Sequence, residues 1–90
     1  MIRFSDEYDV WRKEVYAKDD YTCRKCDDNT GNNLNAHHQY NFSSNEMLRM
    51  AVSNGITFCE DCHTQFHKTY GFKNNSPMQV MRFLLECDEL

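Results

Sequence analysis

The chain has 90 residues, a length that fits one small domain with a thin hydrophobic core. With 40% hydrophobic and 27% charged residues, three glycines and one proline, its composition is that of a globular protein and not of a disordered one. The formal net charge of −4 argues against tight unaided binding to DNA, although it leaves open a local positive site built by a bound metal.

The sequence predicts neither a targeting signal nor a membrane-spanning segment. The longest apolar run, Phe83-Leu84-Leu85, is far too short to cross a bilayer. The first residues, MIRFSDEYD, turn acidic at once and have no apolar stretch behind them, unlike a signal peptide. We therefore expect a cytoplasmic protein with no membrane partner.

Local signals predict a helix, a loop and a strand in the first part of the chain. Ser5 is a suitable N-cap for a helix over residues 5–18, and the acidic residues of its first turn complement the helix dipole. Apolar side chains recur at helical spacing and form one stripe on this helix: Tyr8, Trp11 and Val15. Residues 19–30 are polar and turn-like, and residues 34–38 predict a short strand.

A short helix and a strand are predicted next. Ser43 and Glu46 have the spacing of a capping box for a helix that ends near Val52. Asn54-Gly55 is a turn pair. The Ile-Thr-Phe triplet that follows it is β-prone and predicts a strand.

Two further helices complete the predicted elements. Residues 60–70 have a helical pattern, and Gly71 stands where a C-terminal cap belongs. The run SPMQ at 76–79 combines a cap, a proline and a box glutamine, which predicts a helix over 77–88. Four apolar residues are the expected packing face of this helix: Val80, Met81, Leu84 and Leu85.

Two C-x-x-C pairs are the strongest chemical signal in the sequence. Cys23 and Cys26 form the first pair, and Cys59 and Cys62 form the second. Two such pairs supply the four sulfur ligands of a tetrahedral structural Zn²⁺, at about 2.3 Å each. Disulfides are the alternative, but a cytoplasmic chain with an unpaired fifth cysteine does not favour them. We expect that fifth residue, Cys87, to be a buried, inert thiol.

The four histidines fall beside these cysteines or between them. His63 follows the second pair directly and His67 lies four residues later, so on a helix both imidazoles share one face and can bind one ion. A lone pair at this spacing is more often an ordinary surface or core pair. The other two, His37 and His38, lie in the segment that the cysteine pairs bracket, and this coincidence favours a second metal site.

The doublet His37-His38 sets a geometric condition on such a site. Neighbouring side chains of a strand point to opposite faces. We therefore expect an irregular or bulged backbone here if both rings are to serve one reactant.

Five segments of the chain together resemble a known enzyme family. They read WRKEV, YTCRKC, LNAHH, SNGITFCEDCH and FHKTYG, and they span about residues 11–71. With a histidine doublet, a central Asn and a final His in order inside a double C-x-x-C frame, they resemble the HNH endonucleases, notably the small ones common in phages and prophages. The resemblance implies a small α+β fold, and the length of the chain predicts a single domain over residues 1–90. A ββα-metal core at about 19–71, stapled by a four-cysteine zinc site, would lie between helices at 5–18 and 77–88.

The resemblance also implies a role for each matched residue. His38 matches the general base, which takes a proton from the attacking water. His37 and His63 match ligands of the catalytic metal, and His67 matches a further ligand that only some members use. Asn54 matches the central Asn, which either steadies the base-bearing loop or lies near the metal; an ordinary turn pair is its alternative interpretation. His38, Asn54 and His63 are thus the expected catalytic residues.

The expected cofactors are one structural Zn²⁺ and one catalytic divalent ion. The metal set of His37 and His63 contains no carboxylate, so Mg²⁺, Mn²⁺, Ni²⁺ and Zn²⁺ all stay open, although imidazole ligands favour a transition metal. The chain departs from the family pattern at Gln39 and Phe58, and neither change removes a catalytic group.

The expected function is hydrolysis of phosphodiester bonds in DNA, by nicking or by double-strand cutting, in the host cytoplasm if the chain is phage encoded. This chemistry needs a base with a pKa near 7, which histidine supplies, and positive charge at the phosphate. The alternative is a non-catalytic zinc module that binds DNA or protein on the same scaffold. The sequence does not distinguish between three biological roles: DNA packaging beside a larger partner such as a phage terminase, homing, and host defence.

Contacts with DNA are less clearly indicated. Five basic residues lie near the expected site in sequence and are candidates for phosphate contacts, with an ordinary solvated surface as the alternative for each: Arg24, Lys25, Arg49, Lys68 and Lys73. The sequence predicts no recognition helix or basic arm. We therefore expect weak sequence preference.

Overall fold

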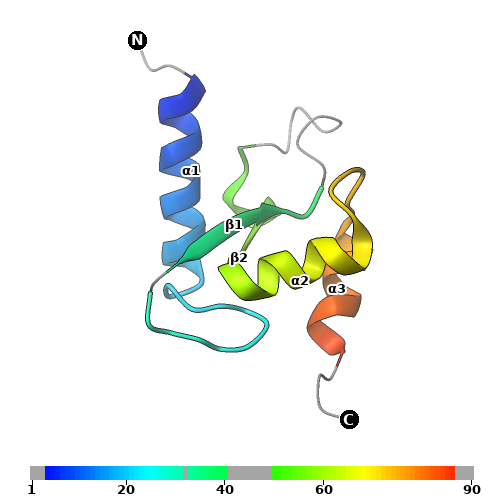
Figure 1. The fold of residues 1–90 in the computed structure, drawn as a ribbon. Helices are drawn as coiled ribbons and strands as arrows, with labels where there is room; N and C mark the ends of the chain where they lie inside the picture. Colours follow the sequence, from blue (N-terminus) through cyan, green and yellow to red (C-terminus); the bar gives the residue numbers. More distant parts are fainter. Residues whose placement is uncertain (1–3, 32, 41–49, 87–90) are drawn as a thin grey trace.

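The computed structural model describes residues 4–31, 33–40 and 50–86. The elements follow in the order α1 (Phe4–Lys18), β1 (Leu34–His38), a 3₁₀ turn η1 (Val52–Asn54), β2 (Gly55–Cys59), α2 (Glu60–Tyr70) and α3 (Pro77–Leu85) (Figure 1). The two strands form one antiparallel sheet. The described chain is therefore a small α+β fold of three helices and a two-stranded sheet. Within these ranges no helix has the length and apolar character needed to cross a bilayer.

The strand β2 lies at the centre of the molecule, and all five of its residues are buried. Thr57 faces α1, where its hydroxyl donates a hydrogen bond of 3.3 Å to the carbonyl oxygen of Val15. Phe58 faces the opposite way, with its ring centroid 6.0 Å from Phe66 of α2 and 5.4 Å from Phe83 of α3. Because successive side chains of a strand alternate between faces, one short strand supports helices on both sides.

The helix α1 covers one face of the sheet (Figure 1). Trp11 and Val15 of its apolar stripe are buried, as predicted, and Tyr8 is half-buried. The helix begins at Phe4, one residue before the predicted N-cap Ser5, and it ends where the sequence predicted. The stripe thus anchors α1 on the sheet.

A buried acid anchors the turn after α1 to β2. Asp19 is 5% exposed, and its Oδ2 accepts a hydrogen bond of 3.0 Å from the backbone N–H of Thr57. Its Oδ1 accepts from the ammonium of Lys18 at 2.7 Å. The backbone N–H of Arg24 then donates to the carbonyl of Thr57 at 2.9 Å. These bonds hold the first C-x-x-C pair beside β2.

The helix α2 has the predicted bounds, and specific groups close both of its ends. The Sγ atom of Cys59 accepts from the backbone N–H of Cys62 at the N-terminus. Gly71 caps the C-terminus with φ 83°, and its N–H donates to the carbonyl of His67 at 2.8 Å. Glycine adopts this left-handed conformation without the steric cost that a side chain brings.

The helix α3 starts with the predicted capping box but differs from its prediction in two respects. It ends at Leu85 and not near residue 88. Its buried face consists of Val80 and Phe83, whereas Met81 and Leu85 are exposed, so the predicted packing face is wrong in part. The physical reason is helix geometry: Val80 and Phe83 are three residues apart and lie on one face, where Phe83 packs against Phe58. Met81 and Leu85 lie outside this face and are exposed.

The helix predicted from Ser43 and Glu46 lies mostly outside the described residues. Its predicted end near Val52 is wrong, because Ala51 is not helical and the 3₁₀ turn begins at Val52. The carbonyl oxygen of Ala51 instead accepts a hydrogen bond of 2.9 Å from the indole Nε1–H of Trp11. A tertiary contact therefore takes the place of a further helical turn here.

Candidate functional site

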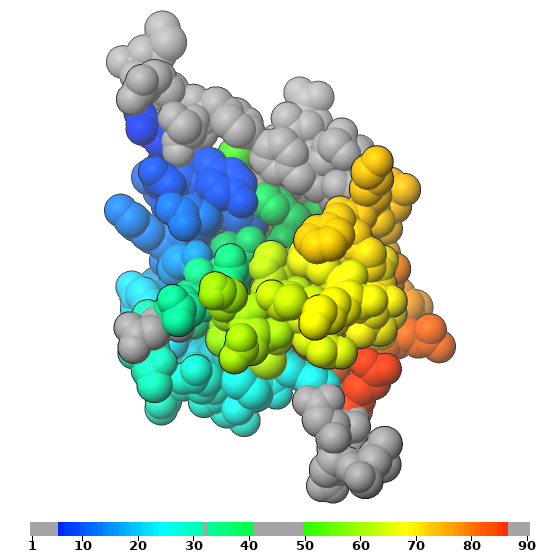
Figure 2. Space-filling view, viewed as in Figure 1, coloured from blue at the N-terminus to red at the C-terminus, as the bar shows by residue number. Residues whose placement is uncertain are grey.

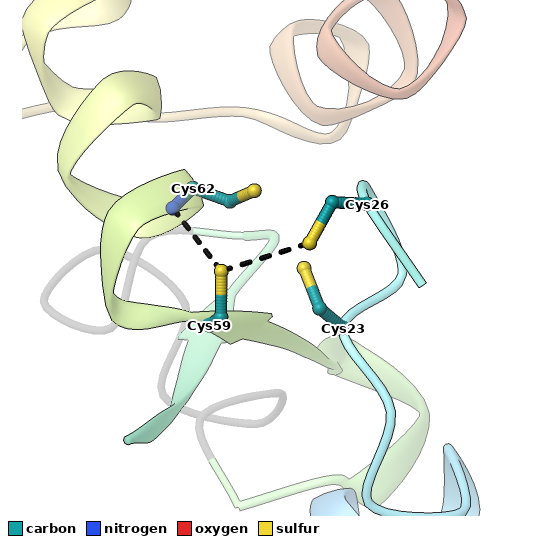
Figure 3. Close-up of side chains that lie close together, drawn as sticks. All are labelled: Cys23, Cys26, Cys59 and Cys62. Carbon is teal, nitrogen blue, oxygen red and sulfur yellow. Dashed lines mark hydrogen bonds between the residues drawn. The ribbon is translucent and has the colours of Figure 1, made fainter. Parts of the chain in front are cut away.

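The two C-x-x-C pairs meet where β2 passes into α2, with their sulfur atoms directed toward one another (Figure 3). Cys23 and Cys26 lie in the segment after α1, Cys59 ends β2, and Cys62 lies in the first turn of α2. The four sulfurs lie within 4.8 Å of one another, and those of Cys26 and Cys59 are 3.8 Å apart. Tetrahedral zinc with ligands at about 2.3 Å separates its sulfurs by about 3.8 Å. All four thiols are free of disulfides, and the cluster could hold a structural zinc ion.

Electrostatics at this cluster favour a bound cation. Burial disfavours the Cys23 thiolate, but backbone N–H donors, including those of Cys26 and Cys59, outweigh burial and lower the pKa of Cys23. Burial and neighbouring sulfurs raise the pKa of Cys26 and of Cys62. A thiolate at one sulfur disfavours deprotonation of its neighbours, and a divalent cation between the four sulfurs would stabilise all of the thiolates. The fifth cysteine, Cys87, lies outside the described residues.

A second cluster contains three of the four histidines. His37 comes from β1, while His63 and His67 lie one turn apart on α2. His37 Nδ1 is 3.3 Å from His63 Nε2, which is 3.0 Å from His67 Nε2. Nitrogens bound at 2.0–2.1 Å to one ion, 90–110° apart, are separated by roughly 2.9–3.4 Å. The three rings therefore have the spacing of a metal-binding set.

Burial keeps the inner imidazoles of this cluster neutral. His37 is 5% exposed and meets the ring of Phe66 edge-on, with centroids 4.6 Å apart. Burial and then the neighbouring His63 lower the pKa of His37 to about 3. Burial and then His67 lower the pKa of His63 to about 4. Neutral imidazole is the form that binds metals, so both rings are ready ligands at neutral pH.

The C-terminus of α2 orients His67. The Nδ1–H of His67 donates to the carbonyl oxygen of Gly71 at 2.8 Å, which leaves Nε2 as the nitrogen that faces the cluster. Phe72 stacks on the other side of this ring, with centroids 4.4 Å apart and planes 10° apart. His37, in contrast, has a buried Nε2 with no hydrogen-bond partner among the described residues. A hydrogen bond thus supports the outer nitrogen of His67 and not that of His37 among the described residues.

The histidine doublet lies on a regular strand. His37 pairs with Ile56 and His38 with Gly55 in an unbroken antiparallel register. The expected irregular backbone is therefore wrong for this strand. His37 faces α2, and His38 faces α1, where it stacks on Trp11 with ring centroids 4.0 Å apart.

Both rings of the doublet nevertheless line one surface pocket. Within the described chain β1 is paired on one side only, so side chains from its two faces border its open edge. In Figure 2 the green of β1 is seen between the blue of α1 and the yellow of α2. The pocket is lined by residues of α1, β1, α2 and the segment before α3: Tyr8, Ala36, His37, His38, His63, His67 and Asn75. A single reactant could therefore reach the three-histidine cluster and His38 together.

Asn54 holds the backbone that follows β1. Its side chain is buried; Oδ1 accepts from the N–H of Tyr40 at 2.8 Å, and Nδ2 donates to the carbonyl of Tyr40 at 3.2 Å. Its own carbonyl accepts from the N–H of Gln39 at 2.8 Å. These bonds continue the strand ladder beyond His38. Of the two roles expected for Asn54, the geometry supports the steadying one.

The basic residues near the site differ in their surroundings. Lys25 donates to carbonyl oxygens at the end of α3, and Arg24 pairs with a buried acid. Lys68 and Lys73 are exposed, and Arg49 lies outside the described residues. Lys25 therefore has a structural role, while Lys68 and Lys73 stay candidates for phosphate contact.

One contact of the site is not predicted from the sequence. Trp11 belongs by its spacing only to the apolar stripe of α1, yet it stacks on His38. Gly55 is the residue from which such a contact could have been inferred, because glycine at a strand position often marks the close approach of another group.

The donor atoms of the two clusters differ in chemistry. Four sulfurs form a closed shell around zinc, whereas three imidazoles leave positions on an ion for water or substrate. Comparison with protein-family models, with curated proteins and with solved structures found no match to this chain.

Proposed function

We propose that this chain is a metal-dependent DNA endonuclease of the HNH type, in which β1, β2 and α2 form a ββα-metal core. The observation that carries the proposal is the pocket at the open edge of β1, which His38 shares with the cluster of His37, His63 and His67. A metal-binding set beside an imidazole that does not belong to it could supply both the positive charge and the general base that assist hydrolysis of a phosphodiester. The order of the motifs along the chain supports the same assignment.

Each residue of the site has a distinct role in this proposal. His37, His63 and His67 would hold a divalent ion, which would supply positive charge to stabilise the negative charge that develops during cleavage. His38 accepts a proton from water while the water oxygen attacks phosphorus and the bond to the 3′ oxygen breaks. Asn54 holds the backbone after His38 and so limits the movement of this base.

The charge of the chain bears on how it meets DNA. With 10 Lys and Arg against 14 Asp and Glu, unaided affinity should be weak and nearly independent of sequence. A larger protein partner would then direct the enzyme to its substrate. The phage or prophage origin and the cytoplasmic location that the resemblance implies stay predictions.

Cleavage of a supercoiled plasmid tests this function, with Mg²⁺, Mn²⁺, Ni²⁺ or Zn²⁺ added to zinc-loaded protein. We expect wild-type protein to cleave with at least one ion and to bind two ions per chain. His38→Gln should slow cleavage by about 10²–10⁴-fold, because it lacks the base, and should keep both ions. His37→Gln should lose cleavage together with the second ion, as measured by isothermal titration and elemental analysis.

Thr64→Ala is the matched control, because Thr64 is exposed on α2 between the two helix histidines. It should retain cleavage and both ions. If the wild-type protein cleaves with none of the ions, the non-catalytic zinc module takes the place of the enzyme. If His38→Gln loses the second ion while His37→Gln keeps it, the roles of the two rings are reversed.

A further inference from the structure

The indole of Trp11 forms a flat platform under His38. Their ring planes are 9° apart, and their centroids are 4.0 Å apart. Trp11 is 2% exposed, so the platform lies inside the protein. Its Nε1–H donates to the carbonyl oxygen of Ala51 at 2.9 Å, which fixes the indole within its own plane. The imidazole therefore rests on a side chain that has little freedom to move.

Gly55 makes room for this platform. It pairs directly with His38 across the ladder, and directly paired residues of an antiparallel sheet extend to the same face. A Cβ atom at position 55 would lie 2.8 Å from Cζ2 of Trp11 and would also overlap Val15. Any other residue here would occupy the space that the indole fills. Because Gly55 has no side chain, α1 can approach the end of β1 that carries His38.

The position of His38 explains why such a platform matters. His38 is the last residue of β1, and the bonds of Asn54 that follow it hold the backbone and not the imidazole. The outer torsion of a histidine side chain has broad energy wells, and the strand alone leaves the ring orientation loosely determined. Stacking constrains the imidazole through its face, whereas the nitrogen lone pair that accepts a proton lies in the ring plane. The platform can therefore hold the ring without blocking its nitrogen.

We propose that Trp11 is a positioning residue for His38, holding the imidazole plane in the orientation that directs a ring nitrogen toward water in the pocket. This inference rests on the proposed function, since it assigns to Trp11 the alignment of the proposed general base. A base acts only within hydrogen-bond reach of the proton that it removes. Loss of the platform should therefore slow the chemical step and leave the metal sites unchanged.

Plasmid cleavage by Trp11→Leu and Trp11→Phe tests the proposal, each with zinc and the active ion bound. Trp11→Leu keeps apolar bulk but has no flat ring, and we expect kcat to fall by about 10²-fold with KM nearly unchanged. Trp11→Phe keeps a flat ring and should show a smaller loss. Tyr16→Leu is the control, because Tyr16 is an aromatic residue of α1 whose hydroxyl bonds to Leu34 and not to the pocket. It should lose stability and keep its kcat.

A double-mutant cycle separates positioning from general damage to the fold. In a His38→Ala background, Trp11→Leu should slow the residual cleavage no further, because the group that it positions is gone. Proton NMR supplies a readout without activity: the ring current of the indole should shift the ring protons of His38 upfield in wild-type protein, and the shift should vanish in Trp11→Leu. If Trp11→Leu does not fold, the smaller loss of kcat in Trp11→Phe decides, because it should occur when His38 is present and disappear in the His38→Ala background.

Two results would overturn the role of Trp11 while leaving the nuclease intact. One is an unchanged kcat in a folded Trp11 variant, and the other is an equal loss with and without His38. Absence of cleavage by wild-type protein would instead overturn the proposed function. In that case the upfield shift would still show that Trp11 stacks on His38, but His38 would not act as a general base.

Discussion

The chemistry of the four histidines depends on which neighbours each ring meets. His37 is held between aromatic rings and other imidazoles, which disfavours its protonation. His38, the next residue, lies on the other face of the strand against an indole. One residue type at adjacent positions thus meets two different surroundings, because a strand sends neighbours to opposite faces.

The buried neutral state of His37 predicts a pH dependence of stability. Its pKa is about 3 in the folded protein and near 6.5 in an unfolded chain, so the unfolded state binds more protons between these values. Stability is therefore highest above pH 6.5 and falls as the pH drops, by up to about 1.4 kcal/mol per pH unit from this residue. Urea denaturation of protein that holds one zinc ion per chain, with the histidine cluster free of metal, measures the loss at pH 7 and pH 5.

The His37→Gln variant isolates this contribution, because the cysteine cluster titrates equally in both proteins. Between pH 7 and pH 5 the wild-type free energy of unfolding should fall by on the order of 2 kcal/mol more than that of the variant. Equal losses in the two proteins would show that His37 is not held neutral by burial.

At the scale of the elements, side-chain groups at their ends hold the fold together. The ammonium of Lys25, between the first two cysteines, donates to the carbonyl of Phe83 and, at 2.6 Å, to that of Glu86. It also lies 4.7 Å from the ring centroid of Phe83. A cation at a helix C-terminus satisfies the last carbonyls and complements the dipole. Lys25 therefore holds the segment with the first C-x-x-C pair against α3.

Replacing Lys25 should loosen α3 selectively. Lys25→Met keeps the length of the side chain but removes the charge and the donors, and we expect it to lower the free energy of unfolding by about 1 kcal/mol. Amide hydrogen exchange should speed up in α3 and stay unchanged in α1. Lys13→Met is the control, because Lys13 is exposed on α1. If the amides of α3 exchanged at the same rate in Lys25→Met as in Lys13→Met, Lys25 would not stabilise α3.

At the scale of the whole molecule, the core is small and two of its members are cysteines. One cluster of buried side chains joins the sheet, α2 and α3: Cys23, Ile56, Phe58, Cys59, Phe66, Val80 and Phe83. A chain of this size buries too little apolar surface to be more than marginally stable by packing alone. Zinc at the four cysteines would tie the segment after α1 to the β2–α2 junction and so contribute much of the folding free energy.

Removal of one zinc ligand should therefore unfold most of the chain. Cys26 is the informative position, because it is exposed and its replacement by serine leaves no cavity in the core. We expect Cys26→Ser to lose zinc by elemental analysis and to show no cooperative thermal transition at 25 °C or above. Cys87→Ser should keep one zinc ion per chain and a cooperative transition. A folded Cys26→Ser protein without zinc would contradict the structural role of the metal.

Features that depend on residues close together in the chain could be predicted from the sequence. The bounds of β1 and α2, the capping box of α3 and the grouping of four cysteines follow from patterns of a few residues, because caps, turns and ligand pairs act over one or two turns. The packing face of α3 did not follow, since this helix carries several apolar residues and only the assembled core decides which of them are buried.

The way in which the histidines combine depends on the packed fold and could not be predicted from the sequence. Sequence predicted a metal set with His37 and His63 and a separate role for His38, but it required an irregular strand to bring them to one reactant. A regular strand with an open edge brings both rings to the same pocket instead. The stack of Trp11 on His38 likewise depends on how closely α1 approaches Gly55. Such contacts join residues far apart in the chain, and their geometry is set by packing that no local pattern encodes.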